Sequence, residues 1–177
     1  NQPVPVKELV ENTVQLLERQ AKSRDTKIVF SFGPNFPDML ECDHGRLRQI
    51  LVNLIGNAIK FTSAGDISIR ATHQDQVGDK LRIKFSVADT GIGISEQDLE
   101  RVFDRFQQIE DGNNRTRGGS GLGLSISRSL ARAMGGDLTL ESGSNRGTVA
   151  SFTFTSQPIE VSTRTQAACA STPSQDL

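Results

Sequence analysis

Residues 43–61 read DHGRLRQILVNLIGNAIKF, and this stretch predicts the helix around which the chain is organised. Asp43 is the expected N-cap, because its carboxylate can accept hydrogen bonds from the first free amides of the helix. The apolar residues recur at three- and four-residue spacing, so they share one face, which we expect to be core. These residues are Leu47, Ile50, Leu51, Leu54 and Ala58.

A second, polar stripe follows another face of the same helix. Gln49, Asn53, Asn57 and Lys60 succeed one another after four, four and three residues. The two Asn and Gly56 cost roughly 2 kcal/mol of helix propensity relative to alanine, which favours a task for this face. Amide oxygens and an ammonium group suit a metal ion and a phosphate. A solvated polar face with incidental Asn is the alternative, and the helix alone leaves it open.

Composition places the chain among soluble proteins with one ordinary domain. Its 177 residues are 35% hydrophobic with a net charge of −1. No apolar run reaches the roughly 18 residues that a membrane-spanning helix needs. The lack of a basic bias argues against a nucleic acid or an anionic membrane surface as partner. Because the chain begins with Asn1 rather than Met, we expect it to be a piece of a longer protein.

The cysteines and histidines predict neither a disulfide framework nor a metal centre. Cys42 and Cys169 are isolated, and neither His44 nor His73 has a partner at metal-ligand spacing. This cysteine usage fits a reducing compartment, so we expect a cytoplasmic domain, whether or not the parent protein is anchored in a membrane.

Hydrophobic periodicity predicts a mixed α/β order around the central helix. An extended lead-in over residues 2–6 precedes a helix over 7–21 and a β-rich run over 27–32. Further strands are expected over 67–72 and 80–89 with a polar loop at 74–79, and a hairpin over 137–141 and 148–155. From residue 157 onward Ser, Thr, Gln, Ala and Pro predominate without periodicity. We therefore expect one domain over residues 1–156 and a disordered tail or linker over 157–177.

Asp89 ends the clearest strand and is in phase with its apolar side. Leu81, Ile83, Phe85 and Val87 precede it in strict alternation. If the strand persists to this residue, the carboxylate points at the core, and burial without a partner costs several kcal/mol. We therefore expect a donor from the protein or from a ligand. In the alternative, the strand ends one residue earlier and Asp89 only caps the turn.

Two glycine-rich segments follow this strand. Residues 90–94 read TGIGI, where glycine permits positive φ and close approach of a backbone or ligand. Ser95 with Asp98 then predicts a helix start, and that helix carries Leu99, Val102, Phe103 and Phe106. The second segment, 119–123, reads GSGLG and opens a helix over 124–134, so it offers free amides to an anion. Neither a dinucleotide fingerprint nor a P-loop is present.

The ordered set of these motifs resembles the ATP-binding catalytic domain of sensor histidine kinases, in the superfamily that includes gyrase and MutL. NLIGNAIK (residues 53–60) resembles the N box and DTGIG (89–93) the first G box. FDRF (103–106) resembles the F box and GSGLG (119–123) the second G box. The resemblance covers about residues 6–155. It implies the Bergerat ATP-binding fold, an α/β two-layer sandwich whose mixed, mostly antiparallel sheet is packed on one side by about three helices.

The resemblance also implies residue roles. Asn57 would coordinate Mg²⁺, Asn53 and Lys60 would contact phosphate or its hydration shell, and Asp89 would accept a hydrogen bond from the adenine amino group. The remaining residues implied to bind nucleotide are Phe61, Gly91, Gly93, Ile94, Phe106, Arg115, Arg117, Gly119, Ser120, Gly121, Leu122 and Gly123. Residues 107–120 would form the ATP lid, with Arg115 and Arg117 inside it.

The position of Asn53 separates two chemistries within this superfamily. The gyrase and MutL branch carries a Glu there as the base for water attack, whereas Asn cannot take a proton at neutral pH. The resemblance therefore implies that ATP serves phosphoryl transfer, which needs positioning and charge neutralisation. The acceptor would be a histidine on a phosphoacceptor domain absent from this chain, for relay to an Asp of a receiver domain.

Two departures from the family pattern leave alternatives open. Neither His44 nor His73 lies in the His-[Glu/Asp]-x-x-[Arg/Asn] setting of a phosphoacceptor helix, so we expect the substrate histidine to be absent from this chain. Gln107 and Gln108 stand where many members carry Arg or Lys as a phosphate contact, so Arg105, Arg115 or Arg117 would supply that charge. Such Gln-rich versions resemble those of hybrid kinases, which carry a receiver domain downstream. A degenerate, non-catalytic module that binds nucleotide, or nothing, and regulates a partner kinase is the first alternative. A serine protein kinase of the anti-sigma type on the same fold is the second.

Overall fold

The polar-striped helix forms as the sequence predicts. In the computed structural model, which describes residues 1–99, 101–104, 122–142 and 146–159, this helix is α2 and spans His44–Phe61. The Asp43 side chain caps it by accepting a hydrogen bond from the Arg46 amide at 3.0 Å. Its apolar face is buried at Leu47, Ile50, Leu51, Leu54, Ile55, Ala58 and Ile59.

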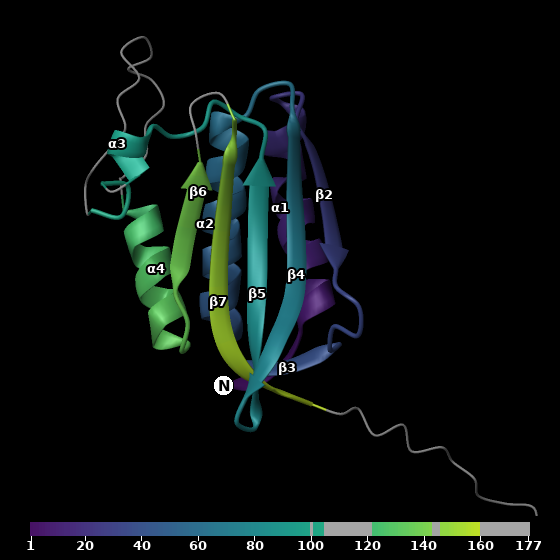
Figure 1. The fold of residues 1–177 in the computed structure, drawn as a ribbon. Helices are drawn as coiled ribbons and strands as arrows, with labels where there is room; N and C mark the ends of the chain where they lie inside the picture. The colour runs from purple at the N-terminus through teal and green to yellow at the C-terminus, as the bar shows by residue number, and fades with distance from the viewer. Residues whose placement is uncertain (100, 105–121, 143–145, 160–177) are drawn as a thin grey trace, which may run out of the picture.

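A seven-stranded sheet lies against this helix (Figure 1). Its path runs β1-β3-β7-β5-β4-β2, and β6 pairs with β7 beside that path. Only the β2–β4 pair is parallel among the strand pairs described, so the sheet is mixed and mostly antiparallel. The strands are β1 (Gln2–Pro5), β2 (Lys27–Phe32), β3 (Met39–Cys42), β4 (Asp66–Val77), β5 (Lys80–Asp89), β6 (Leu138–Ser142) and β7 (Thr148–Pro158).

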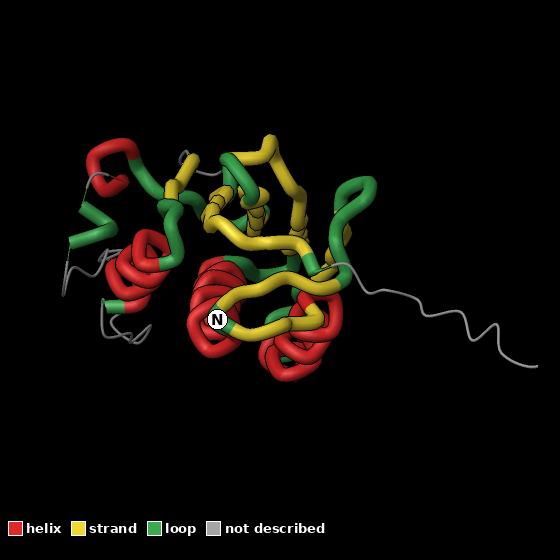
Figure 2. The backbone as a smooth tube through the Cα atoms, turned by 90° about the horizontal axis from the view of Figure 1, so that it is seen from below, coloured by secondary structure: helices red, strands yellow, loops and turns green. Residues whose placement is uncertain are grey.

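Three helices cover one face of this sheet, as Figure 2 shows in end-on view. α1 (Val6–Lys22) and α4 (Gly123–Ala133) flank α2, and a fourth helix, α3 (Glu96–Leu99), is a single turn. None of the helices in the described ranges is long and apolar enough to cross a membrane. The α/β two-layer sandwich with a helical layer on one side is confirmed.

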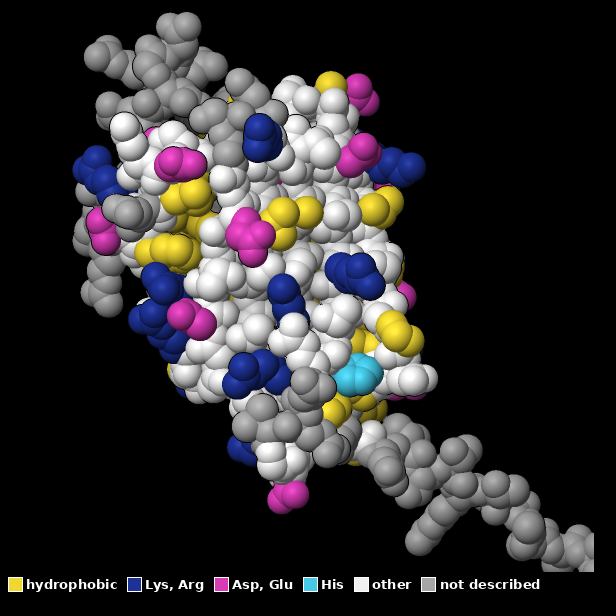
Figure 3. All heavy atoms as spheres, in the orientation of Figure 1, with side chains coloured by type: hydrophobic (Ala, Val, Ile, Leu, Met, Phe, Trp, Pro, Cys, Tyr) yellow, Lys and Arg dark blue, Asp and Glu magenta, His cyan; other side chains and the backbone are white. Residues whose placement is uncertain are grey.

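Strict alternation along the strands separates the core from the outer face of the sheet. Phe85 and Phe152, from β5 and β7, are fully buried under the helices and stack with ring centroids 5.2 Å apart. Arg82 and Lys84 alternate with the buried residues of β5 and point to the opposite face, where Figure 3 shows Lys and Arg side chains spread over the sheet. One face therefore builds the core, and the other is polar.

The predicted polar loop over residues 74–79 is wrong. β4 continues to Val77, β5 begins at Lys80, and a β-bulge between Gln74 and Gln76 keeps the two strands paired. Gly78, with φ of 65°, makes the tight turn that joins them. The strand persists because β5 supplies backbone partners along its whole length, which outweighs the weak strand preference of Gln and Asp.

The short strands β1 and β3 and the end of β7 also differ from the sequence prediction. β3 was not predicted, and the lead-in is strand β1, since four-residue strands carry no periodic signal and these two pair with each other. β7 runs two residues past the predicted domain end, pairing Gln157 and Pro158 with β3. The remaining tail, residues 160–177, lies outside the described residues.

The helix that starts at Ser95 is shorter than predicted. Ser95 does cap it, since its Oγ lies 2.7 Å from Asp98 Oδ2 and accepts from the Asp98 amide at 3.2 Å. The helix nevertheless ends at Leu99, so the prediction that it carries Val102 and Phe103 is wrong. A segment this short gains little from helix formation. Tertiary packing places its apolar side chains instead: the Phe103 ring lies 4.4 Å below the Arg128 guanidinium carbon.

Candidate functional site

The polar stripe of α2 is partly exposed, and one of its residues, Asn53, contacts α4. Gln49, Asn53 and Asn57 line an open groove of about 610 Å³ along this helix. Asn53 Nδ2 donates a hydrogen bond to Ser127 Oγ on α4 at 2.8 Å. A Cβ added to Gly123 would lie only 2.2 Å from Asn53 Oδ1, so the start of α4 approaches this amide as closely as glycine allows. The fold therefore brings Asn53 and Gly123 together.

The C-terminal end of α2 carries the next two predicted residues. Lys60 Nζ lies 4.9 Å from the centroid of the Phe61 ring, in cation–π contact. The Phe61 carbonyl accepts from the Ile92 amide at 3.3 Å. A Cβ on Gly91 would meet that same carbonyl oxygen at 2.3 Å. The glycine loop after β5 is thus packed against the end of α2, and glycine at position 91 is a steric requirement.

Asp89 lies where the strand alternation places it, and it also caps the turn. β5 persists through this residue, which pairs with Thr148 of β7. Its Oδ1 accepts from the Gly91 amide at 2.9 Å and from the Thr148 amide at 3.3 Å. The interpretation in which the strand persists and the carboxylate meets a donor is therefore confirmed. The alternative, in which the strand ends one residue earlier, is wrong, although Asp89 does cap the turn through the Gly91 amide.

Burial raises the pKa of the Asp89 carboxyl, and the amide hydrogen bonds from Gly91 and Thr148 offset only part of this effect. The two amides bind one carboxylate oxygen, so the group keeps acceptor capacity for a ligand at this end of the sheet.

The loop after Asp89 is fixed by a hydroxyl that the sequence analysis did not select. Ile94 donates its amide to Ser142 Oγ at 2.7 Å, and Ser142 Oγ donates to the Gly147 carbonyl at 2.7 Å. Gly93 and Gly147 both have a φ of 74°, a region that favours glycine. The sequence predicts a hairpin whose connection includes residue 147, but no local signal reveals that a Cβ on Gly147 would clash with the Asp89 carbonyl.

The start of α4 supplies the remaining described residues of the predicted set. Leu122 is the N-cap residue and Gly123 the first helical residue. The first amides of a helix have no acceptor within it, so they present donors and the positive end of the dipole. The other predicted binding residues lie outside the described residues: Phe106, Arg115, Arg117, Gly119, Ser120 and Gly121.

These contacts place the described candidate residues in two groups along the C-terminal half of α2. At one end, the Asp89 carboxylate and the amides around it can recognise a planar group that donates a hydrogen bond. At the other, Asn53 offers its amide beside the start of α4, and Asn57 lies about one helical turn further along α2. Asn53 and Phe61 are eight positions apart on α2, roughly 12 Å at 1.5 Å per residue. This arrangement suits an elongated ligand with an aromatic amine at one end and an anionic group at the other.

Comparison with known proteins agrees with this geometry. The family described as histidine kinase-, DNA gyrase B-, and HSP90-like ATPase matches residues 42–158. The signal transduction histidine-protein kinase BarA of Escherichia coli (strain K12) is 38% identical over 145 residues, 82% of this chain and 16% of BarA. The sensor histidine kinase AruS of Pseudomonas aeruginosa is 40% identical over 142 residues, 80% of this chain and 14% of AruS. The chain thus spans about a sixth of these relatives or less.

A solved structure shares the fold as well as the sequence. Full-length ShkA in complex with AMPPNP superposes with a TM-score of 0.73 at 33% identity, over 89% of this chain and 31% of ShkA. The sequence match, the shared sheet with its helical layer, and the grouping of the N-box and G-box residues agree with one another. The chain therefore belongs to the family of histidine kinase-, DNA gyrase B- and HSP90-like ATPases, as an ATPase domain of the sensor histidine kinase kind.

Proposed function

We propose that this domain binds Mg-ATP and transfers its γ-phosphoryl group to a histidine on a phosphoacceptor domain of the same parent protein. The acceptor histidine would then pass the group to an Asp of a receiver domain. The observation that carries this proposal is the half-buried carboxylate of Asp89, held by the Gly91 and Thr148 amides at the end of β5. ShkA, which shares the fold, was solved with AMPPNP.

Asp89 would recognise the adenine end of the nucleotide. An ionised carboxylate is an acceptor only, so its uncommitted oxygen suits the exocyclic amino group of adenine. Phe61, at the end of α2, and Ile94, in the glycine loop, lie on the segments that pack together next to Asp89. An amide in place of the carboxylate could turn a donor toward the base, so position 89 would decide the choice of base.

Asn57 and Asn53 would serve the phosphate end. Both side chains line the same groove on α2, and amide oxygens belong to the hard oxygen ligands that Mg²⁺ accepts. The donor chemistry therefore fits a magnesium ion held by Asn57 together with phosphate oxygens. Bound there, the ion would neutralise charge on the phosphates. Lys60 and the amides at the start of α4 would add positive charge at this end.

Asn53 favours transfer over hydrolysis. The residue has no carboxylate to accept a proton from water, and its Nδ2 is bound to Ser127. Phosphoryl transfer depends mainly on positioning and electrostatic stabilisation, which the other residues would supply. The acceptor histidine must come from outside the chain, because neither His44 nor His73 has the sequence setting of a phosphoacceptor.

Calorimetric titration of Mg-ATP into the domain tests the proposal. We expect the wild type to bind, Asp89→Asn to lose at least roughly 100-fold in affinity, and Asn57→Ala to lose the Mg²⁺ dependence. Asp79→Asn, in the exposed turn at the other end of β5, is the matched control and should bind like the wild type.

Transfer is then tested by adding an isolated phosphoacceptor domain and radiolabelled ATP. Label that is lost in acid indicates phosphohistidine, whereas acid-stable label would identify a serine kinase. A folded wild type that binds no nucleotide would overturn the catalytic proposal in favour of a regulatory module.

A further inference from the structure

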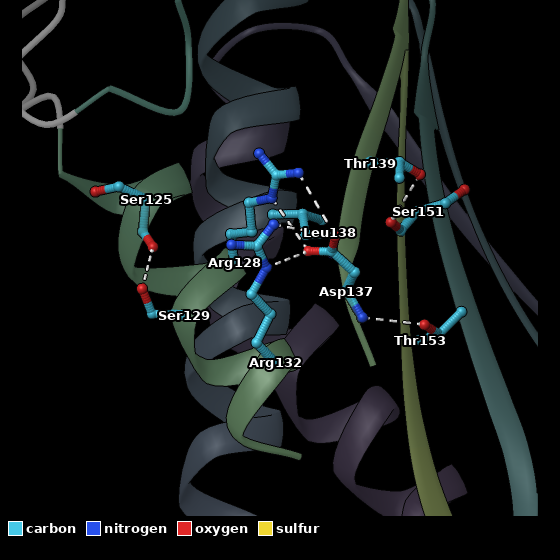
Figure 4. Close-up of polar contacts among 9 residues, drawn as sticks. All are labelled: Ser125, Arg128, Ser129, Arg132, Asp137, Leu138, Thr139, Ser151 and Thr153. Atoms are coloured by element: carbon cyan, nitrogen blue, oxygen red, sulfur yellow. Dashed lines mark hydrogen bonds and ion pairs between the residues drawn. The ribbon is translucent and has the colours of Figure 1, made fainter. Parts of the chain in front are cut away.

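One buried hydroxyl of α4 is directed at the polar stripe of α2. Ser127 is only 1% exposed, and its Oγ accepts the hydrogen bond from Asn53 Nδ2 across 74 residues of sequence. The hydroxyls of Ser125 and Ser129 on the same helix donate instead to the carbonyls of the N-cap residue Leu122 and of Ser125. Figure 4 shows Ser125 and Ser129 on the side of α4 away from the Asp137 cluster. Ser127 therefore makes a contact between helices that its neighbours do not make.

The two ends of the Asn53 amide differ chemically, so its orientation matters. The nitrogen carries two donors and the oxygen only acceptors. Because the nitrogen is bound to Ser127, the oxygen is turned toward the start of α4, into the space that a Gly123 side chain would occupy. Ser127 and Gly123 thus act on opposite ends of one amide. Loss of the hydroxyl would leave a donor without this partner and allow the amide to rotate.

The position of this oxygen distinguishes two possible contacts of Asn53, one with phosphate oxygens and one with the waters around a metal ion. Phosphate oxygens are acceptors and gain nothing from another acceptor, whereas a hydrated cation offers donors from its water ligands. We propose that Ser127 is a positioning residue that fixes the Asn53 oxygen toward the hydration shell of the magnesium ion that accompanies the nucleotide. This inference rests on the proposed function, which leaves the contacts of Asn53 and any role of Ser127 open.

The inference predicts an effect on metal dependence rather than on nucleotide binding in general. The measured quantity is the ratio of ATP dissociation constants without and with Mg²⁺, from calorimetry on the whole domain. Partners that orient a group at a metal site typically change metal affinity by roughly 10- to 100-fold. Ser127→Val should lower the ratio by about tenfold, while the affinity for ATP in the presence of a chelator stays unchanged.

Ser127→Thr is the matched variant. Thr and Val have the same shape, so both substitutions introduce the same extra volume at this buried position. Only Thr keeps the hydroxyl. Ser127→Thr should restore the Mg²⁺ dependence, and thermal unfolding should show the two variants equally folded. Ser129→Ala, on the exposed side of α4, should leave the ratio at its wild-type value. As a single substitution, Asn53→Ala should also lower the ratio. Combined with Ser127→Val, it should lower the ratio little further.

The outcomes separate this inference from the proposal it rests on. If the wild type binds ATP with a clear Mg²⁺ dependence and Ser127→Val keeps the same ratio, the positioning role is overturned while the proposed function stands. Equal losses in Ser127→Thr and Ser127→Val would also overturn it, because packing rather than the hydroxyl would then be responsible. If the wild type binds no ATP under any condition, both proposals fall together.

Discussion

At the scale of single residues, Ser142 shows how one side chain can organise a site. Its hydroxyl accepts from the Ile94 amide, donates to the Gly147 carbonyl and lies 3.0 Å from Thr148 Oγ1. It therefore ties the glycine loop after β5 to the start of β7, the strand that also supplies the Thr148 amide to Asp89. A hydroxyl is suited to this position because it donates and accepts at the same time.

Replacing this hydroxyl should destabilise the fold measurably. Ser142→Ala leaves the Ile94 amide and the Gly147 carbonyl without this partner, so we expect the free energy of unfolding in urea to fall by about 2 kcal/mol. Ser129→Ala removes a hydroxyl that bonds only within its own exposed helix, and it should change stability by less than about 0.5 kcal/mol. Equal effects of the two substitutions would contradict the organising role of Ser142.

Asp89 illustrates a residue whose place was predictable from its neighbours. Alternation along β5 puts it in phase with Phe85 and Val87, and the structure keeps it in the strand. The prediction that it must meet a donor is confirmed by the Gly91 and Thr148 amides. The second of these donors was not predictable, since the register between β5 and β7 is set by packing along both strands.

At the scale of elements, Gly56 and Gly91 have opposite steric surroundings at α2. Gly56 lies inside the helix, and a Cβ added there would meet nothing within 4 Å. Gly91 lies in the loop that packs against the end of α2, where a Cβ would clash with the Phe61 carbonyl. Sequence patterns mark both as unusual but do not reveal which one is sterically required.

The same substitution should therefore have opposite effects at these two positions. Gly56→Ala should raise the free energy of unfolding by about 0.5–1 kcal/mol, because it reduces the backbone entropy lost in the helix. Gly91→Ala should lower it by about 3 kcal/mol, because a carbonyl of the backbone cannot move aside as a flexible side chain can. Chemical denaturation of both variants measures the difference. A neutral Gly91→Ala would show that the loop is not seated on α2 as described.

At the scale of the whole molecule, α4 is held to the sheet by a charged cluster at its C-terminal half. Figure 4 shows the Arg128 and Arg132 side chains converging on Asp137, which directly precedes β6. Their Nε atoms lie 3.1 and 3.0 Å from Asp137 Oδ1. The Arg128 guanidinium also lies over Phe103. The cluster therefore connects α4, the sheet and the segment after α3.

This cluster makes stability depend on pH. Partial burial raises the pKa of the Asp137 carboxyl, but the hydrogen bonds from Arg128 and Arg132 dominate in sum and hold the pKa well below its usual value of 3.8. Because the folded pKa is lowered, the ionised group stabilises the fold above the unfolded pKa. This contribution is lost as the pH falls through and below that value.

Asp137→Asn should remove this pH-dependent contribution. Since the Asp137 side chain is 40% exposed, solvent screening limits the expected loss to about 1 kcal/mol at neutral pH. Urea unfolding across a pH series should show a constant difference from the wild type between about pH 7 and pH 5 and a shrinking difference below about pH 4. Glu141→Gln, at an exposed residue of β6 with no ion pair among the described residues, is the control. A difference that persists unchanged to low pH would contradict the electrostatic origin.

Local spacing rules were enough to predict part of the fold and of the candidate site. Helical and strand periodicity placed Asn53 and Asn57 on one face of α2 and Asp89 at the end of β5, and Asp43 and Ser95 were identifiable as caps. Such features depend on residues within a few positions of one another, where spacing reports which face a side chain occupies.

Tertiary structure alone decided which groups meet across the chain. Asn53 and Ser127 are 74 residues apart and Ile94 and Ser142 are 48 apart, and a serine has no periodic signature that distinguishes a partner from a bystander. Strands β1 and β3 likewise form because they pair with each other and with the end of β7. The physical reason is that local spacing fixes the direction of a side chain, whereas only the packing of the helices on the sheet fixes what lies opposite it.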